Sequence, residues 1–377
     1  MSTGTLFVQD SRTGVKYDIP IRRNAIRALD LLRIQAPAGG HDRTDQVSLG
    51  LRVYDPGLQN TAVIESSISF SDHERGVLIF RGYTLEQLWD SDFEDMFYLL
   101  LWGTYPTVHQ RIQLSRTLVE RMQQVPGEVF KAIRGLPPTS PPLSLILAGL
   151  TACLAFQPDA IPRSSNPTIY QEDLRHADRE ILQAVASYVA ILLSPFFHIE
   201  RRPRYGPSGL FGAPAAYGPL HFGATESARH ALREIGDPNN IPRFLDEVKS
   251  GKRKLFGYGH RSYKGIDPRV QPIQAILKDL MDPDPLLKLA ETIEVAASTD
   301  GYFLSRQLYP NADFYGNFVF TGIGIEAEMI PAAMISHRIM GIMAHWRAYM
   351  ATRGKIFRPS HIYTGPMSAT REVAAKF

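Results

Sequence analysis

The stretch Leu255–Arg269, LFGYGHRSYKGIDPR, decides how the rest of the chain is interpreted. Gly257 and Gly259 allow the backbone to approach a ligand at places where a Cβ atom would obstruct it. His260 comes next, and three cationic side chains follow it: Arg261, Lys264 and Arg269. This combination suits an anionic ligand held by backbone amides and cations, with an imidazole aimed at a polar group. The alternative is a loop before a helix, with charges that are merely solvated.

Two further stretches accompany this one, Tyr217–Glu226 (YGPLHFGATE) upstream and Asn311–Gly316 (NADFYG) downstream. At these three places the chain resembles the citrate synthase family. That family shows a GPLHGGANE-like turn, an FGHRVYKxxDPR-like loop and an NVDFYSG-like segment in the same order. Here they read GPLHFGATE, YGHRSYKGIDPR and NADFYGN.

The resemblance extends over most of the chain, from about residue 6 to residue 366. Leu78–Leu88, LIFRGYTLEQL, is similar to the family's LLYRGYPIEQL, and Tyr98–Thr107, YLLLWGTYPT, is similar to its YLLLxGxLPT. Near the end, Arg358–Pro366, RPSHIYTGP, is similar to RPRxLYTG. Several motifs in a fixed order are far more specific than a lone glycine pattern.

Composition and charge limit the class of protein. A chain of 377 residues can bury a large core, and we expect one large unit with a smaller subdomain. The net charge of +3 is too small to indicate nucleic-acid binding, and no basic cluster with interleaved aromatics is seen. Cys153 is the one cysteine, so an internal disulfide and a multi-cysteine zinc site are excluded. It lies in an apolar run, which predicts a packed core thiol.

The termini bear on location. The first residues, MSTGTLFVQDSRTG, lack an apolar signal region and an arginine-rich mitochondrial presequence. No run approaches the ~20 apolar residues of a membrane span, so we expect no membrane partner. We expect a cytoplasmic protein. A peroxisomal location is the weaker alternative, because the final Ala-Lys-Phe resembles a peroxisomal tripeptide.

Hydrophobic periodicity predicts a mostly α fold with a small N-terminal β region. Alternation around Arg12-Thr-Gly14 predicts a β-hairpin at 5–21, and residues 50–81 form a second β-rich stretch. Thr84 and Gln87 have the spacing of a capping box. Helical patterns occupy residues 84–91, 92–102, 106–125, 128–134, 141–156, 175–193, 226–234, 241–250, 269–280, 286–297, 300–308, 314–323 and 331–353.

The resemblance implies the two-domain citrate synthase fold. Residues 1–221 would form the first part of a large domain, and residues 325–377 its C-terminal part. Residues 222–324 would form a small domain that closes over it. Closure would exclude water from the reacting groups.

Joining an acyl-CoA to a keto acid requires a base, a donor for the enolate oxygen, a donor for the ketone and cations for the carboxylates. The resemblance implies that Asp313 is the base. It implies that His221 stabilises the enolate oxygen and that His260 polarises the ketone carbonyl. This chemistry needs no metal and no redox cofactor. The coenzyme A thioester enters as a co-substrate, and both substrates are small molecules.

Three arginines match the carboxylate-binding positions of the family: Arg269, Arg338 and Arg358. The planar guanidinium suits this task because it can bind a carboxylate at two points. The family's counterpart of Arg358 reaches into the partner's site, which implies a homodimer with composite sites. The resemblance also gives Lys264 to the CoA phosphate, although many such lysines are only solvated. It gives the backbone of residues 256–260, with Gly257, Tyr258 and Gly259, to the adenine side.

One family motif is missing from this chain. Family members carry a helix with an HxDHExxxS-like motif before GPLH, and its second histidine helps to bind the keto acid. The nearest string, His176–Glu180, has arginine at the decisive place and lies too far upstream. The expected place is the stretch from Leu193 to Gly218. Either a block of about 40 residues is truly deleted, or the sequence as written lacks a segment of the natural protein. We favour the second explanation; His198 is a weak candidate substitute.

A second departure lies beside His221. Phe222 stands where the family usually has glycine, and Thr225 stands where it has asparagine. An aromatic ring at position 222 would reshape the pocket near the acyl group. We therefore expect a longer or different acyl-CoA in place of acetyl-CoA, as in alkylcitrate-forming relatives.

The sequence thus predicts an acyltransferase that converts the acyl group into an alkyl group on transfer. It would condense an acyl-CoA with oxaloacetate and release citrate or an alkylcitrate and free CoA. One alternative is a catalytically silent relative that acts as a binding or regulatory subunit, which the missing helix favours. An unrelated CoA-binding protein is a further alternative, for which the ordered motifs leave little room.

Overall fold

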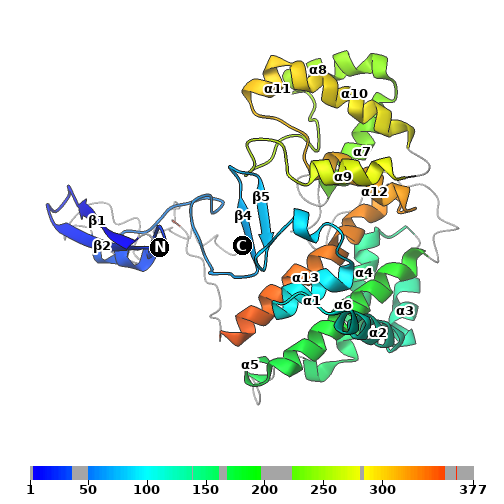
Figure 1. The fold of residues 1–377 in the computed structure, drawn as a ribbon, viewed down its shortest axis with the longest axis horizontal. Coiled ribbons are helices and arrows are strands. Elements are labelled where there is room, and N and C mark those ends of the chain that lie inside the picture. The colour runs from blue at the N-terminus through cyan, green and yellow to red at the C-terminus, as the bar shows by residue number, and fades with distance from the viewer. Residues whose placement is uncertain are drawn as a thin grey trace, which may run out of the picture. The chain divides into compact units, whose positions relative to one another are not determined.

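The computed structural model describes residues 3–35, 50–137, 139–160, 168–196, 223–280, 284–352 and 362 (Figure 1). The chain divides into two compact units. The first consists of residues 1–65 and 355–377, and the second consists of residues 66–354. The candidate chemistry of the described residues lies in the second unit.

The first unit contains the predicted hairpin. Strands β1 (Thr3–Gln9) and β2 (Lys16–Arg22) pair antiparallel, and a short β3 (Ala25–Ile26) extends the sheet. The turn between β1 and β2 is closed by the carboxylate of Asp10, which accepts hydrogen bonds from the backbone and the guanidinium of Arg12. The hairpin prediction is confirmed.

The second β-rich prediction is only partly right. Three short strands form, β4 (Ser69–Asp72), β5 (Val77–Phe80) and β6 (Tyr83–Thr84), but residues 51–68 contain no strand. The reason is local, because Asp55 folds the chain back on itself. Its carboxylate accepts hydrogen bonds from the backbone amides of residues 59 and 60 and from the Thr61 hydroxyl, which bends the chain there.

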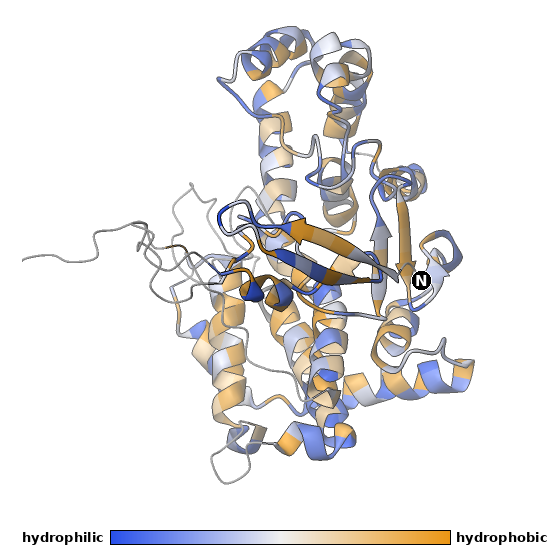
Figure 2. Cartoon of the chain, turned by 90° about the vertical axis from the view of Figure 1, so that its left-hand side faces the viewer, coloured by the Kyte–Doolittle hydropathy of each residue, from blue (hydrophilic) through white to orange (hydrophobic). Residues whose placement is uncertain are grey.

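Except for the short α5, which lies where no helix is predicted, the helices of the second unit follow the predicted ranges closely. They are α1 (Phe93–Trp102), α2 (Val108–Gln123), α3 (Gly127–Arg134), α4 (Pro142–Ala155), α5 (Ile169–Glu172), α6 (Leu174–Phe196), α7 (Gly223–Ile235), α8 (Ile241–Lys249), α9 (Val270–Lys278), α10 (Pro285–Thr299), α11 (Gly301–Ser305), α12 (Ala312–Gly322) and α13 (Ile330–Ala351). The described chain is therefore mostly helical, as predicted. Its helices carry mixed hydrophobic and hydrophilic residues (Figure 2).

The helix predicted at 84–91 is shorter than expected. The capping box between Thr84 and Gln87 is made in both directions, at 2.9 and 3.4 Å, but it opens only the 3₁₀ turn η2 (Glu86–Leu88). The prediction of the capping box is confirmed, but the predicted helix does not continue to residue 91. The next helix, α1, begins with its own N-cap residue at Asp92.

Two hydrophobic clusters hold the second unit together. The first joins α1, α2, α3, α4, α6 and α13. Cys153 is 6% exposed within it, which confirms the packed core thiol. The hydroxyl of Tyr188 donates to the Ala332 carbonyl at 2.7 Å and ties α6 to α13. The second cluster joins α7 to α12 around Phe314, Tyr315 and other buried residues. The domain boundaries near residues 221 and 324 remain predictions.

Among the described helices, none alone is long and apolar enough to cross a membrane. α12 and the segment Ala327–Ala351 reach that length and hydropathy only as a pair, across a bend of 117°. Within the same residues, no group of three histidine, cysteine or carboxylate side chains is arranged to hold a metal ion.

Candidate active site

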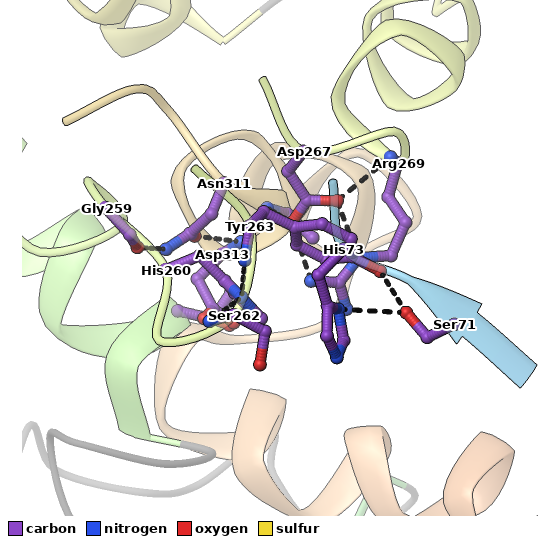
Figure 3. A network of polar contacts seen from close by, with 12 residues as sticks. Ser71, His73, Gly259, His260, Ser262, Tyr263, Asp267, Arg269, Asn311 and Asp313 are labelled. Carbon is purple, nitrogen blue, oxygen red and sulfur yellow. Dashed lines mark hydrogen bonds and ion pairs between the residues drawn. The ribbon is translucent and has the colours of Figure 1, made fainter. Parts of the chain in front are cut away.

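A network of polar contacts joins the loop 255–269 to the segment 309–313 (Figure 3). The amide of Asn311 donates to the Gly257 carbonyl and the amide of Gly259 donates to the Tyr309 carbonyl, each at 2.8 Å. The side chain of Asn311 adds a bond from Nδ2 to the Gly259 carbonyl at 2.8 Å. These bonds fix the backbone on both sides of the site, so His260 and Asp313 are carried by segments that are tied together.

Asn311 also begins α12. Its Oδ1 accepts a hydrogen bond from the Asp313 amide at 2.9 Å, which is the usual bond of an N-cap residue. Asp313 is therefore in the first turn of α12, where the helix dipole favours a negative charge. The backbone of Asp313 is held by the same side chain that holds Gly259.

Among the described residues, the carboxylate of Asp313 has one direct partner from a distant part of the chain. The hydroxyl of Thr225, in the first turn of α7, donates to Oδ1 at 2.6 Å. Thr225 is 1% exposed. This short bond fixes one oxygen of the carboxylate, so the base proposed from the sequence is held by two separate elements.

His260 is held in one tautomer. Its Nδ1 accepts hydrogen bonds from the backbone amides of Ser262 and Tyr263, each at 3.1 Å. Nδ1 therefore carries no proton, and Nε2 must carry it in the neutral ring. Burial and the charge of Arg269 lower the pKa of His260 below its ordinary value. The result is a neutral imidazole with one N–H donor, which is what polarising a carbonyl oxygen requires.

Arg269 is oriented by Asp267. Its Nε and Nη2 donate to the two carboxylate oxygens at 2.9 and 2.6 Å, and its backbone amide donates to Oδ1 at 3.0 Å. Asp267 is 1% exposed and also accepts the Ala312 amide at 3.1 Å. Burial alone would raise the pKa of Asp267, but the bonds from Arg269 and Ala312 outweigh it and the pKa is lowered. The carboxylate thus ties the guanidinium to the start of α12.

Arg338 on α13 lies within electrostatic reach of the same groups. The residue is exposed, yet the pKa of its guanidinium is lowered. The larger cause is partial loss of water around the charge, and the second is the positive charge of Arg269. The negative charge of Asp313 acts in the opposite direction and raises the pKa. Two arginines from different elements therefore act on one region beside Asp313 and His260. Such a region can hold the carboxylates of a small dianion.

The structure brings together four of the residues predicted from the sequence: His260, Arg269, Asp313 and Arg338. His221, Arg358 and Phe222 lie outside the described residues, as does His198. Lys264 is exposed on the loop, and its role towards a CoA phosphate stays a prediction.

The glycines of the loop approach the chain itself. Gly257 has φ +78°, and a Cβ atom there would lie 2.7 Å from the backbone of Phe314. A Cβ atom on Gly259 would lie 2.8 Å from the side chain of Leu308. Close packing of loop against α12 is thus one reason for these glycines, whether or not a ligand also approaches. The ring of Tyr258 packs edge-on against Phe314, and the CoA contact of the backbone here stays a prediction.

Sequence reasoning missed the neighbours of His260. Ser71, on β4, lies 3.1 Å from Nδ1 of His73 and 3.2 Å from the hydroxyl of Tyr263. The rings of His73 and Tyr263 meet edge to face, and the rings of Tyr263 and His260 lie 4.6 Å apart. Ser71 and Tyr263 are 192 residues apart, so no local pattern could have shown the contact.

Comparison with known proteins shows to which family the chain belongs. The family model for the citrate synthase C-terminal domain matches residues 57–202 and 209–360. The chain belongs to the citrate synthase family. The match is interrupted at residues 203–208, inside the stretch where the sequence predicts a missing helix.

Individual relatives give the same result. The chain is 37% identical to the alkylcitrate synthase phiJ of a fungal species (strain ATCC 74256), over 96% of this chain and 94% of the relative. It is 30% identical to the glyoxysomal citrate synthase of Cucurbita maxima, over 96% and 82%. The alignment with phiJ spans 431 residues against 377 here, so that relative carries residues without a counterpart in this chain.

A solved structure shows the same fold. The citrate synthase of the archaeon Thermoplasma acidophilum, in ternary complex with carboxymethyl coenzyme A and oxaloacetate, superposes with a TM-score of 0.69 at 23% identity. The match covers 84% of this chain and 97% of that one. The citrate synthase-like fold predicted from the sequence is confirmed.

Proposed function

We propose that the protein condenses an acyl-CoA with oxaloacetate and then hydrolyses the thioester, which releases free CoA. It would thus be a transferase that converts the acyl group into an alkyl group. The observation that carries the proposal is the joining of His260 and Asp313 by Asn311, with Arg269 and Arg338 beside them.

Each residue has a step that its geometry suits. Asp313 takes a proton from the carbon next to the thioester, and the resulting enolate carbon attacks the ketone carbon of oxaloacetate. His260 donates from Nε2 to the ketone oxygen as negative charge develops there. Arg269 and Arg338 bind the carboxylates. His221, outside the described residues, would donate to the enolate oxygen. Water then cleaves the thioester, in which coenzyme A takes part as a co-substrate, and the proposed chemistry uses no further cofactor.

The acyl group is proposed to be longer than acetyl. Phe222 occupies the place of the family's glycine beside His221. The chain is 37% and 35% identical to two proteins named alkylcitrate synthases, phiJ and the tstJ protein of Talaromyces stipitatus. An alkylcitrate is therefore the preferred product, with citrate as the alternative.

The quaternary structure is proposed to be a homodimer in which Arg358 of one subunit completes the site of the other. This follows from the match of residues 358–366 to the family's RP motif, whose arginine crosses the interface. Closure of residues 222–324 over the rest would shield the thioester from water.

Free CoA release tests the function. The protein is mixed with oxaloacetate and acyl-CoAs from C2 to C10, with Asp313→Ala as the control. We expect release that requires both oxaloacetate and Asp313, with a preference for chains longer than C2. A clear preference for acetyl-CoA would contradict the acyl-chain proposal alone.

The second candidate is a catalytically silent subunit. The interrupted family match and the missing second histidine of the HxDHE motif favour it. No release with any donor, from protein that binds oxaloacetate, would support this candidate and overturn the first.

A further inference from the structure

We propose that Thr225 is a positioning residue for Asp313, holding one carboxylate oxygen so that the other receives the substrate proton. The inference rests on the proposed function, because it assigns a task to the base of that reaction. It adds a residue for which the resemblance gives no role.

The hydroxyl of Thr225 has little choice of partner. Thr225 is 1% exposed, and a buried hydroxyl is costly without a hydrogen bond. Its Oγ1 lies 2.6 Å from Asp313 Oδ1 and 3.5 Å from the sulfur of Met334. A hydroxyl has one proton, and a carboxylate is a much stronger acceptor than a thioether. The proton therefore points at Oδ1.

The donor is also rigid. Threonine is branched at Cβ, so its χ1 angle is restricted in a helix. The residue stands in the first turn of α7, which packs against α12, and the two bonded side chains are 88 residues apart. The position of Oγ1 is thus set by the packing of one helix against the other.

The carboxylate is consequently fixed at two points. Asn311 holds the backbone of Asp313, and Thr225 holds Oδ1. Among the described residues, no hydrogen bond to Oδ2 is found. Oδ2 is therefore the oxygen that takes the proton from the acyl α-carbon, and the bond at Oδ1 keeps it aimed. A base displaced by about 1 Å can lose on the order of 100-fold in rate.

Three variants separate this role from simple packing. Thr225→Val keeps the shape and removes the donor, whereas Thr225→Ser keeps the donor and removes a methyl group. Thr321→Val is the matched control, because Thr321 lies at the other end of α12 and its hydroxyl donates to the Asn317 carbonyl of its own helix. Thr225→Ala is a second donor-free variant in case the valine protein does not fold.

We expect Thr225→Val to lower kcat about 10- to 100-fold, with both KM values within about threefold of wild type. The isotope effect with α-deuterated acyl-CoA should rise, because proton removal becomes slower. Thr225→Ser should recover most of kcat, and Thr321→Val should match the wild type. Melting temperatures are measured on every variant.

Two results would overturn the inference. One is a wild-type kcat and isotope effect in Thr225→Val or, where that protein does not fold, in Thr225→Ala. The other is a Thr225→Ser protein as slow as the donor-free variant. Neither of these two results would contradict the proposed condensation reaction. A wild-type protein that releases no CoA in the presence of oxaloacetate would overturn the proposed function and this inference together.

Discussion

Asp267 is a buried carboxylate that joins two parts of the site. It is 1% exposed, and it binds the guanidinium of Arg269 and the backbone of both Arg269 and Ala312. A carboxylate so deeply placed is stable because every one of these donors is charged or already fixed. Its loss leaves the partly buried guanidinium of Arg269 without its carboxylate partner.

We therefore predict that Asp267→Asn lowers the free energy of unfolding by about 2–3 kcal/mol. The chain offers a matched control in Asp173, which accepts the same bonds from the backbone and Nε of Arg175 but is 43% exposed. Asp173→Asn should cost less than about 0.5 kcal/mol. Urea unfolding of both variants measures the difference. Equal effects would contradict the special role of Asp267.

His260 gives the site a dependence on pH. Its pKa is lowered in the folded protein, whereas the unfolded chain takes up the proton near pH ~6.5. Below that pH the unfolded state binds more protons than the folded state, so this residue makes the folded state less stable as pH falls.

We predict that unfolding measured from pH 7 to pH 5 loses stability faster in the wild type than in His260→Gln. The extra slope is at most about 1.4 kcal/mol per pH unit, the limit for one proton. His337→Gln is a useful comparison, because the surrounding protein and the charge of Arg338 lower the pKa of this exposed residue to about 4. Parallel curves for wild type and His260→Gln would show that His260 takes up its proton at the same pH in both states.

At the scale of elements, the loop 255–269 is joined by hydrogen bonds to the segment that begins α12. Backbone bonds at Gly257 and Gly259 and the side chain of Asn311 join them. Gly257 lies so close to Phe314 that a side chain at position 257 would clash with the backbone of α12.

Gly257→Ala is predicted to lower the free energy of unfolding by about 2–4 kcal/mol, from the strained φ and the clash with α12. Gly265→Ala in the same loop is the control, because its Cβ would meet nothing within 4 Å. The control should change stability by less than about 1 kcal/mol. Similar melting temperatures for the two variants would refute the packing argument.

The elements themselves were largely predictable from the sequence. The long helices α2, α6 and α13 follow from a sustained helical period, and the hairpin β1–β2 follows from alternation around a turn. The failures have physical causes. Asp55 draws backbone amides away from a strand at 51–68, and the cap at Thr84 is followed by too short a run before Asp92 begins α1.

The motif residues of the site were predictable from the sequence, but the residues that hydrogen-bond to them or to their neighbours were not. His260, Arg269, Asp313 and Arg338 stand in recognisable strings. Thr225 and Ser71 act through contacts that span 88 and 192 residues, and spacing along the chain carries no information about such contacts. Only the packing of α7 on α12, and of the β4 strand on the loop, reveals them.

For the whole molecule, α13, which carries Arg338, packs in the first hydrophobic cluster. The segments that carry His260 and Asp313 pack in the second cluster. The interrupted family match at 203–208 lies between the segments that feed these clusters. A block of helix missing there would remove a keto-acid ligand. We therefore expect a higher KM for oxaloacetate than in a relative that carries the motif, without loss of the base.

The proposed homodimer with composite sites can be tested by its mass and by mixing two variants. Its mass from sedimentation equilibrium should be twice the 42.2 kDa of the chain. Asp313→Ala and Arg358→Ala proteins, each inactive alone, should regain about a quarter of wild-type activity when unfolded together and refolded, because each mixed dimer has one intact site. No recovery from a mixture that forms mixed dimers would contradict the composite site.

The central claim is that a carbon–carbon bond forms between the acyl group and the keto acid. The most direct measurement follows the product by NMR, with acyl-CoA labelled with ¹³C at the α-carbon, unlabelled oxaloacetate, and Asp313→Ala in parallel. We predict that the label appears in a tricarboxylate, bonded to the former ketone carbon, in the wild type only. Label found in the free fatty acid, or unchanged in the thioester, would contradict the account.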